Sequence, residues 1–244
     1  MSIWKGNFAP PLGSLSNLID LRIFGCNKLR YALSLNLAQT LESLLLLSVK
    51  DCKMMEGLIP YDVVVVEEAS SAATSFSKCI SPSSRIFCNL QMLEIQHCSG
   101  VFLFPLRLAQ SLVQLGGLWI QECEYMEVIV RGEEGEAEKG EDTMSLRTLF
   151  PRLHTIQLVK LPNLTSFCSV VGAGEVVAPI LLLPSLLIVH VYDCPCLTRL
   201  PLGSQSSLNL EVVMGEKEWL EGLMWDDEKS KTRFIPRLRH YDGI

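Results

Sequence analysis

Cysteine and histidine are the side chains of this sequence whose spacing could support chemistry. The chain has nine cysteines and four histidines. Residues 193–196 read Asp-Cys-Pro-Cys and His190 stands three residues earlier, a set of carboxylate, thiolate and imidazole groups that could bind a metal ion. No second cysteine pair has metal-ligand spacing, and Cys194 has a place in the repeated pattern described below. We therefore expect neither a metal site nor a cofactor.

Signatures of the common enzyme classes are missing from the sequence. It has no Gly-x-x-x-x-Gly-Lys-Ser/Thr loop, no His-Glu-x-x-His, no Gly-x-Ser-x-Gly and no Cys-x-x-Cys. A nucleophile beside a base at convincing spacing is also missing. We expect the four histidine side chains to face outward and to have no catalytic role. They are His97, His154, His190 and His240. The sequence predicts a protein that is not an enzyme and has no small-molecule substrate.

Five of the cysteines share one sequence context. The pattern Leu-x-x-Leu-x-Ile-x-x-Cys runs from Leu18 to Cys26, and it recurs with interchangeable Leu, Ile and Val. A sixth copy has Leu161 in place of cysteine. Such copies are typical of leucine-rich repeats, in which x-Leu-x-Leu-x is a short parallel strand and the cysteine turns inward. The later copies start at Leu44, Leu90, Leu115, Leu153 and Leu186.

The repeats predict an α/β fold, a leucine-rich-repeat solenoid or horseshoe. A parallel sheet of short strands would line its concave face, with irregular or helical segments on the convex side. The strands are expected near 21–23, 47–49, 93–95, 118–120, 156–158 and 189–191. Their two apolar positions should form the core, namely Leu21, Ile23, Leu47, Val49, Leu93, Ile95, Leu118, Ile120, Ile156, Leu158, Val189 and Val191.

We expect two parts along the chain. Residues 1–214 would be the solenoid, with insertions at 57–86, 130–149 and 168–182. Residues 215–244 would cap its last repeat, because their tryptophans and leucines can cover the open end of a stacked core. Residues 131–142 carry six acidic residues against two basic ones. They are expected to form either a solvated, mobile loop or an acidic contact for a basic partner.

Overall charge and hydropathy argue against nucleic acid and membranes as binding partners. The formal net charge of -6 argues against nucleic acid and anionic lipid. No apolar run reaches the length of a membrane span, since residues 179–191 are interrupted by Pro184 and His190. The first residues have no apolar stretch typical of a secretory signal. We expect a cytoplasmic protein whose cysteines are free thiols.

Alternation along each strand predicts the candidate binding surface. The x residues between and after the apolar positions should face away from the core and form two columns. Aromatic residues flanked by polar ones are typical of protein-binding hot spots, although Trp119 could instead pack over its neighbours in an unused concavity. The first column is Arg22, Ser48, Glu94, Trp119, Gln157 and His190, and the second is Phe24, Lys50, Gln96, Gln121, Val159 and Tyr192.

The repeats and the tail resemble the plant intracellular coiled-coil nucleotide-binding leucine-rich-repeat disease-resistance proteins. The likeness lies in the cysteine followed by x-x-Leu, and in residues 150–153 (Phe-Pro-Arg-Leu) and 158–168 (Leu-Val-Lys-Leu-Pro-Asn-Leu-Thr-Ser-Phe-Cys). The tail adds residues 215–228 (Gly-Glu-Lys-Glu-Trp-Leu-Glu-Gly-Leu-Met-Trp-Asp-Asp-Glu) and 233–236 (Arg-Phe-Ile-Pro). This sequence has neither the coiled coil nor the nucleotide-binding domain of that family.

The resemblance implies a sensor region in plant innate immunity. Such a region would bind a pathogen effector, a guarded host protein or the nucleotide-binding domain of its own receptor. A substrate-receptor subunit of a ubiquitin ligase is the alternative, because such subunits also use leucine-rich repeats. An upstream F-box-like helical segment would distinguish the two, and residues 1–12 are too short to form one.

Overall fold

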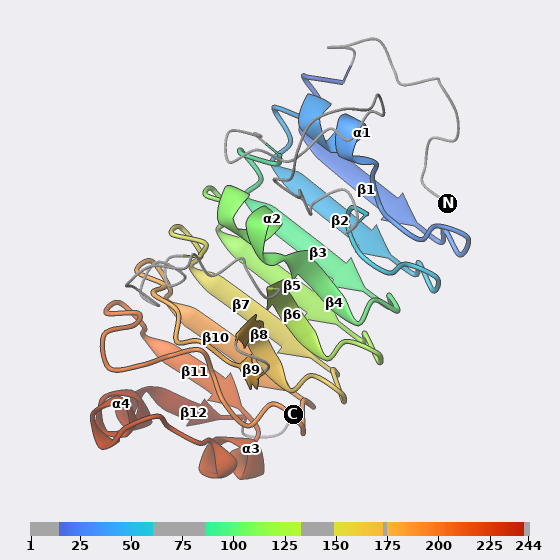
Figure 1. Ribbon diagram of the computed structural model, residues 1–244. Coiled ribbons are helices and arrows are strands. Elements are labelled where there is room, and N and C mark those ends of the chain that lie inside the picture. The colour runs from blue at the N-terminus through green and yellow to red at the C-terminus, as the bar shows by residue number, and fades with distance from the viewer. Residues whose placement is uncertain (1–14, 61–85, 133–148, 173–174, 242–244) are drawn as a thin grey trace.

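Eight short strands form one continuous sheet in the computed structural model, which describes residues 15–60, 86–132, 149–172 and 175–241 (Figure 1). Neighbouring strands all run parallel, in the order β1-β2-β3-β5-β7-β10-β11-β12. Their bounds are β1 Asp20–Phe24, β2 Leu46–Lys50, β3 Met92–Gln96, β5 Gly117–Gln121, β7 Thr155–Val159, β10 Ile188–Tyr192, β11 Val212–Gly215 and β12 Leu238–His240.

The first six of these strands confirm the expected positions, and the repeat pattern explains their register. Each copy of Leu-x-x-Leu-x-Leu lies directly beside the next, so that Leu47 pairs with Leu93 and Leu93 with Leu118. The expected core positions are buried, with the exception of Leu21. Leu21 lies on β1 at the edge of the sheet, where the described residues place a neighbouring strand on one side only. This half-burial corrects the expectation that it belongs to the closed core.

A second, four-stranded sheet covers the opposite side of the core and was not expected from the sequence. Its strands are β4 Phe102–Pro105, β6 Val128–Gly132, β8 Ser166–Gly172 and β9 Glu175–Val177, with β8 and β9 antiparallel. Figure 1 shows it in front of the eight-stranded sheet. The Phe150 ring packs between the rings of Phe104 and Phe167, at centroid distances of 5.8 and 6.4 Å.

The smaller sheet changes the interpretation of two insertions. The segment assigned as 130–149 begins inside β6, and the segment assigned as 168–182 contains most of β8 and all of β9. Some of their apolar side chains are part of the core, since Val130, Cys168 and Val170 are buried, whereas Val176 and Val177 of β9 are exposed. Residues 61–85 of the first insertion and residues 133–142 of the acidic stretch lie outside the described residues.

Two short helices lie on the same side as the smaller sheet (Figure 1). They are α1 Leu35–Thr40 and α2 Leu106–Ser111. The Ser34 hydroxyl caps α1 by accepting a hydrogen bond from the Leu37 amide. Both helices bury two leucines and an alanine, so they close the core beyond the smaller sheet. None of the helices in the described ranges is long and apolar enough to cross a membrane.

The tail adds a strand and two helices at the end of the stack. Helix α3 is Lys217–Gly222 and α4 is Glu228–Phe234, followed by the 3-10 turn η3 Ile235–Arg237 and by β12. Phe234 is fully buried, and Trp225 stacks on it with a centroid distance of 5.7 Å. Trp219 Nε1 donates a hydrogen bond of 2.6 Å to the Leu197 carbonyl. The boundary between solenoid and cap at residue 215 stays a prediction.

Candidate functional site

The candidate site is the outer face of the eight-stranded sheet, the face turned away from the core, the smaller sheet and the two helices. The pairing register places the two expected columns side by side, from Arg22 opposite Ser48 to Gln157 opposite His190. The first column continues through Met214 to Arg239 on strands that the sequence pattern did not reveal. The first column therefore spans all eight strands of the sheet.

Side chains at the N-terminal part of this face are paired with one another. Arg22 Nη2 lies 3.0 Å from Asp20 Oδ2, and Lys50 Nζ lies 2.6 Å from Glu94 Oε1. The Ser48 hydroxyl donates to Glu94 Oε2 at 2.8 Å. Partial burial would raise the pKa of Glu94, but the hydrogen bonds from Lys50 and Ser48 outweigh it and lower that pKa. Phe24 is 73% exposed beside these pairs.

The centre of the face combines Trp119 with three glutamines, Gln96, Gln121 and Gln157, all partly buried. Trp119 Nε1 is buried and has no hydrogen-bond partner among the described residues. A Cβ atom on Gly117 would lie 2.5 Å from the end of the Met92 side chain and 4.0 Å from Trp119 Nε1. Glycine at this position makes room for both large side chains.

Aromatic rings gather at the C-terminal part of the face. The His190 ring lies 5.0 Å from that of Tyr241, and Tyr192 meets Tyr241 edge-on at 5.8 Å. Burial lowers the pKa of His190, which favours its neutral form at pH 7. His190 Nε2 and the Tyr241 hydroxyl are buried and lack a hydrogen-bond partner within the described ranges. Tyr241 belongs to this site, and sequence reasoning missed it.

A row of turn residues follows the strands, and sequence reasoning missed this row as well. Each has left-handed backbone, with φ between 50° and 54°. We call it the rim, and its members are Asp51, His97, Glu122, Lys160 and Asp193. A cysteine thiol can bridge the turn by a hydrogen bond to the carbonyl two residues earlier. The thiols of Cys52 and Cys123 donate in this way to the Lys50 and Gln121 carbonyls. The signal was present as a polar residue directly after x-Leu-x-Leu-x in five of the six copies, with Gly25 at this position in the first copy.

Acidic and basic side chains alternate along most of the rim and contact one another. His97 Nδ1 lies 3.0 Å from Asp51 Oδ1, and its Nε2 contacts Glu122 Oε2. Lys160 Nζ lies 2.9 Å from Glu122 Oε1, and this hydrogen bond is the main reason that the pKa of Glu122 is lowered. Beyond Lys160, the Asp193 amide donates to Glu216 Oε2 at 2.9 Å.

The cysteines lie where a structural role predicts. Cys98, Cys123 and Cys194 are buried, and burial raises their thiol pKa values to about 12, 11 and 11. Cys26 is exposed, which differs from the expected inward position because it follows the edge strand β1. Among the described residues, no group of three or more His, Cys, Asp or Glu side chains is placed to hold a metal ion.

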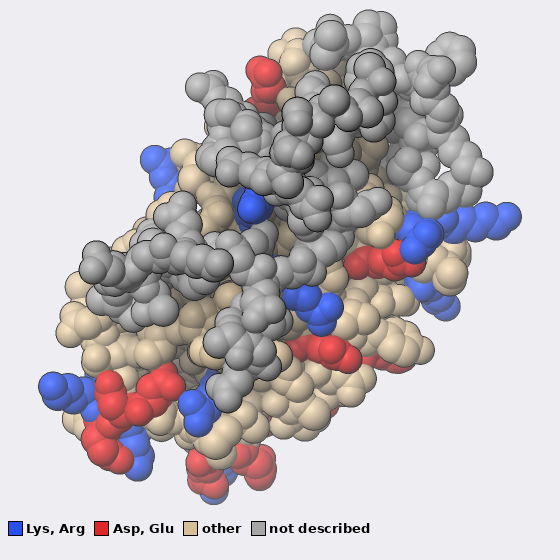
Figure 2. Space-filling view, in the orientation of Figure 1, with Lys and Arg blue, Asp and Glu red and all other residues tan. Residues whose placement is uncertain are grey.

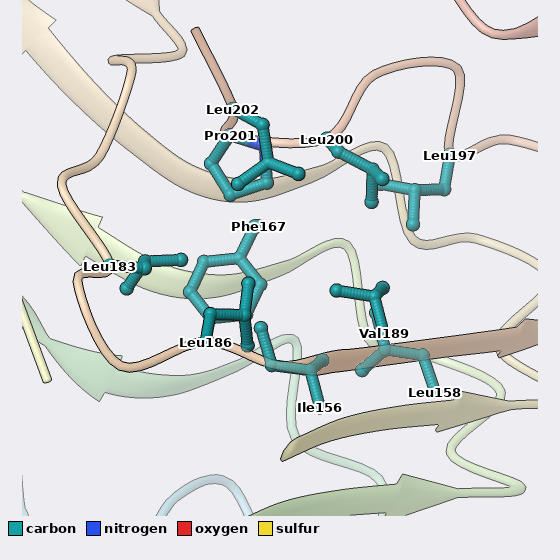
Figure 3. A pocket seen from close by; sticks show the side chains of 10 residues that line it. All are labelled: Ile156, Leu158, Phe167, Leu183, Leu186, Val189, Leu197, Leu200, Pro201 and Leu202. Atoms are coloured by element: carbon teal, nitrogen blue, oxygen red, sulfur yellow. The ribbon is translucent and has the colours of Figure 1, made fainter. Parts of the chain in front are cut away.

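Two hollows of the described part differ in size and in their surroundings. A space of about 10 Å³ lies inside the core between β7, β10 and Phe167 of β8. Figure 3 shows the side chains around it. All of the side chains that line it are apolar, so it is a packing gap in the core. A wide, open groove lies between α3, α4 and β12. At that end of the molecule Figure 2 shows Asp and Glu next to Lys and Arg.

Comparison with known proteins gives one consistent family. The family model described as plant disease resistance protein RPS2-like, leucine-rich repeats, matches residues 1–81 and 75–211. Three relatives from Arabidopsis thaliana are disease resistance protein RPS5 (29% identical, 82% of this chain), putative disease resistance protein At5g05400 (30%, 69%) and disease resistance protein SUMM2 (29%, 68%). These alignments cover 20%, 18% and 17% of the relatives, so the chain spans about a fifth of their length. No solved structure matches the chain.

Proposed function

The chain belongs to the leucine-rich-repeat family of RPS2-like plant disease resistance proteins, and from that premise we propose that it is a protein-recognition module in plant innate immunity. Its partner is a pathogen effector, a guarded host protein or the nucleotide-binding domain of its own receptor. Recognition works through shape and charge and involves no catalysis. The module acts in the cytoplasm, where its buried cysteines remain thiols.

One observation carries this proposal, namely the continuous outer face of eight parallel strands in a single register. Its side chains are held by the ladder beneath them, so they are positioned before a partner arrives. Such preorganisation reduces the entropy that binding must overcome. Curvature of the repeat stack into a horseshoe, with this face on the concave side, is part of the proposal and would increase the area that one partner can contact.

Trp119 is the residue to test first. It lies at the centre of the face on β5. Tryptophan is among the residues most often found in binding hot spots, which cluster near the centre of an interface. We expect Trp119→Ala to weaken binding by about 2 kcal/mol or more without unfolding the chain. The measurement is surface plasmon resonance of the purified chain against pathogen effectors, host proteins and a nucleotide-binding domain from the same receptor.

Tyr125→Ala is the matched control. Tyr125 is 59% exposed but lies on the turn that follows Cys123, away from the two columns. Its removal should leave binding unchanged. Full binding by a folded Trp119→Ala, Tyr192→Ala double variant would show that the partner contacts another surface.

A further inference from the structure

The C-terminal part of the outer face differs in chemistry from the rest. Strand β10 places Ile188, His190 and Tyr192 on this face, and Ile188 and Tyr192 remain 36% and 41% exposed. Val159 pairs with Tyr192 on the neighbouring strand β7. With Tyr241, whose ring contacts those of His190 and Tyr192, these residues form what we call the aromatic patch. Its residues belong to β7, to β10 and to the segment directly after β12, and Figure 1 shows these elements toward the C-terminal end of the stack.

Two carboxylates border the aromatic patch without a cation. Asp193 directly follows Tyr192, and Glu216 directly follows β11. Neither carboxylate forms an ion pair within the described ranges. The nearest basic group along the rim, Lys160, is already bound to Glu122 at 2.9 Å.

Other carboxylates of the outer face already form ion pairs with basic side chains. At its N-terminal part, the Asp20 and Glu94 carboxylates each lie within 3.0 Å of a basic nitrogen, from Arg22 and Lys50 respectively. A cation that approaches there would have to replace an existing partner. At the aromatic patch, negative charge is available next to exposed apolar surface.

We propose that the aromatic patch, together with Asp193 and Glu216, is the contact point for an arginine side chain of the protein partner. This inference rests on the proposed function of the outer face. A guanidinium group stacks on a tyrosine ring, and its carbon stem covers apolar side chains such as Val159. Carboxylates next to the ring supply the complementary charge. Arginine fits better than lysine, because its planar group can stack and bind a carboxylate at the same time.

Nuclear magnetic resonance can test this with the whole chain and a small probe. The probe is N-acetyl-arginine methylamide, and the matched neutral compound is N-acetyl-citrulline methylamide, which has nearly the same shape. We expect the arginine compound to shift the ring signals of Tyr192 and Tyr241 with saturation. The citrulline compound should bind at least five-fold more weakly.

Isosteric variants make the charge requirement explicit. The pair Asp193→Asn and Glu216→Gln should weaken binding of the arginine compound at least five-fold. Asparagine tolerates the left-handed backbone at 193, and a glutamine carbonyl can still accept from the Asp193 amide, so the variant is expected to fold. Asp20→Asn, which removes a carboxylate already paired with Arg22, should leave that binding unchanged.

The outcomes separate this inference from the function on which it rests. Equal binding of the arginine and citrulline compounds, or no effect of the double variant, would overturn the arginine contact. If Trp119→Ala still abolishes protein binding in that case, the outer face keeps its proposed role. If neither the probe nor any protein responds to changes on the face, both proposals fail.

Discussion

At the residue scale, alternation along the strands assigned side chains correctly to the two faces. Ile23, Val49 and Ile120 are buried, and the residues that alternate with them along each strand point outward. Successive side chains of a strand point to opposite faces of the sheet. The rim could not be derived in this way. It depends on a left-handed turn after each strand, and most residue types avoid that conformation unless the surrounding fold imposes it. Asp193 and Glu216 are distant in sequence but close in space, because β10 and β11 pair side by side.

Leu118 is the residue with which to measure the strength of the core. It lies on β5 between Leu93 and Ile156 and is fully buried. We expect Leu118→Ala to lower the free energy of unfolding by about 2–5 kcal/mol, because the lost contacts leave a cavity. Urea titration followed by circular dichroism measures this change. Leu208→Ala, at a position 65% exposed, should change stability by less than about 0.5 kcal/mol.

Cys123 predicts a dependence of stability on alkaline pH. Burial raises its pKa from 9.0 to about 11, so above pH 9 the unfolded chain releases this proton while the folded chain keeps it. The contribution is complete below pH 9 and is lost as the pH rises to about 11, by about 1.4 kcal/mol per pH unit. Cys123→Ala should therefore flatten the decline of unfolding free energy between pH 9 and pH 11.

Leu208→Ala, which changes an exposed side chain without an ionisable group, supplies the comparison for this experiment. It should leave the slope of stability against pH as it is in the unchanged chain. Equal slopes for the Cys123→Ala variant and the unchanged chain would mean that the Cys123 thiol ionises equally well in both states.

At the scale of the elements, the repeat strands were predictable and the smaller sheet was not. The strands of the repeats carry leucines at fixed offsets, and six copies reinforce one another. Strands β4, β6 and β8 begin four or five residues after the repeat positions Cys98, Cys123 and Leu161. Each is a short run, and such runs cannot be told from buried helix or loop segments by periodicity. In the tail, helix α3 contains Trp219 and Leu220, and Leu223 lies directly after its end.

Phe234 tests whether the tail elements belong to the same cooperative unit. It is fully buried at the end of α4 and stacks on Trp225. We expect Phe234→Ala to cost about 3–5 kcal/mol and to expose the end of the core, which would lower solubility. Calorimetry and light scattering measure both effects. Ile235→Ala, one residue later and 48% exposed, is the control, and an equal loss in both variants would argue against the packing of Phe234 as the cause.

At the scale of the whole molecule, the family and the general architecture followed from the sequence, and the fine distribution of surface chemistry required the structure. Repeats predicted a parallel sheet with one face free for binding. They could not predict that ion pairs occupy the N-terminal part of that face while aromatic rings and unpaired carboxylates occupy the C-terminal part. The chemistry of the C-terminal part comes from β10 and from the residues that directly follow β10, β11 and β12, and the last two of these strands lack the full repeat pattern.

The two sheets have different extents, and this has a consequence for how the molecule opens. The smaller sheet lies opposite the middle of the stack, whereas β1 at one end has a strand neighbour on one side only in the described part. In a repeat protein each repeat contacts only its neighbours, so unfolding starts at the repeat that has the fewest of them. We expect amide hydrogens of β1 to exchange with solvent orders of magnitude faster than those of β5 and β6, by local opening that leaves the centre closed. Local, reversible opening of the first repeat would then be an ordinary property of the native state.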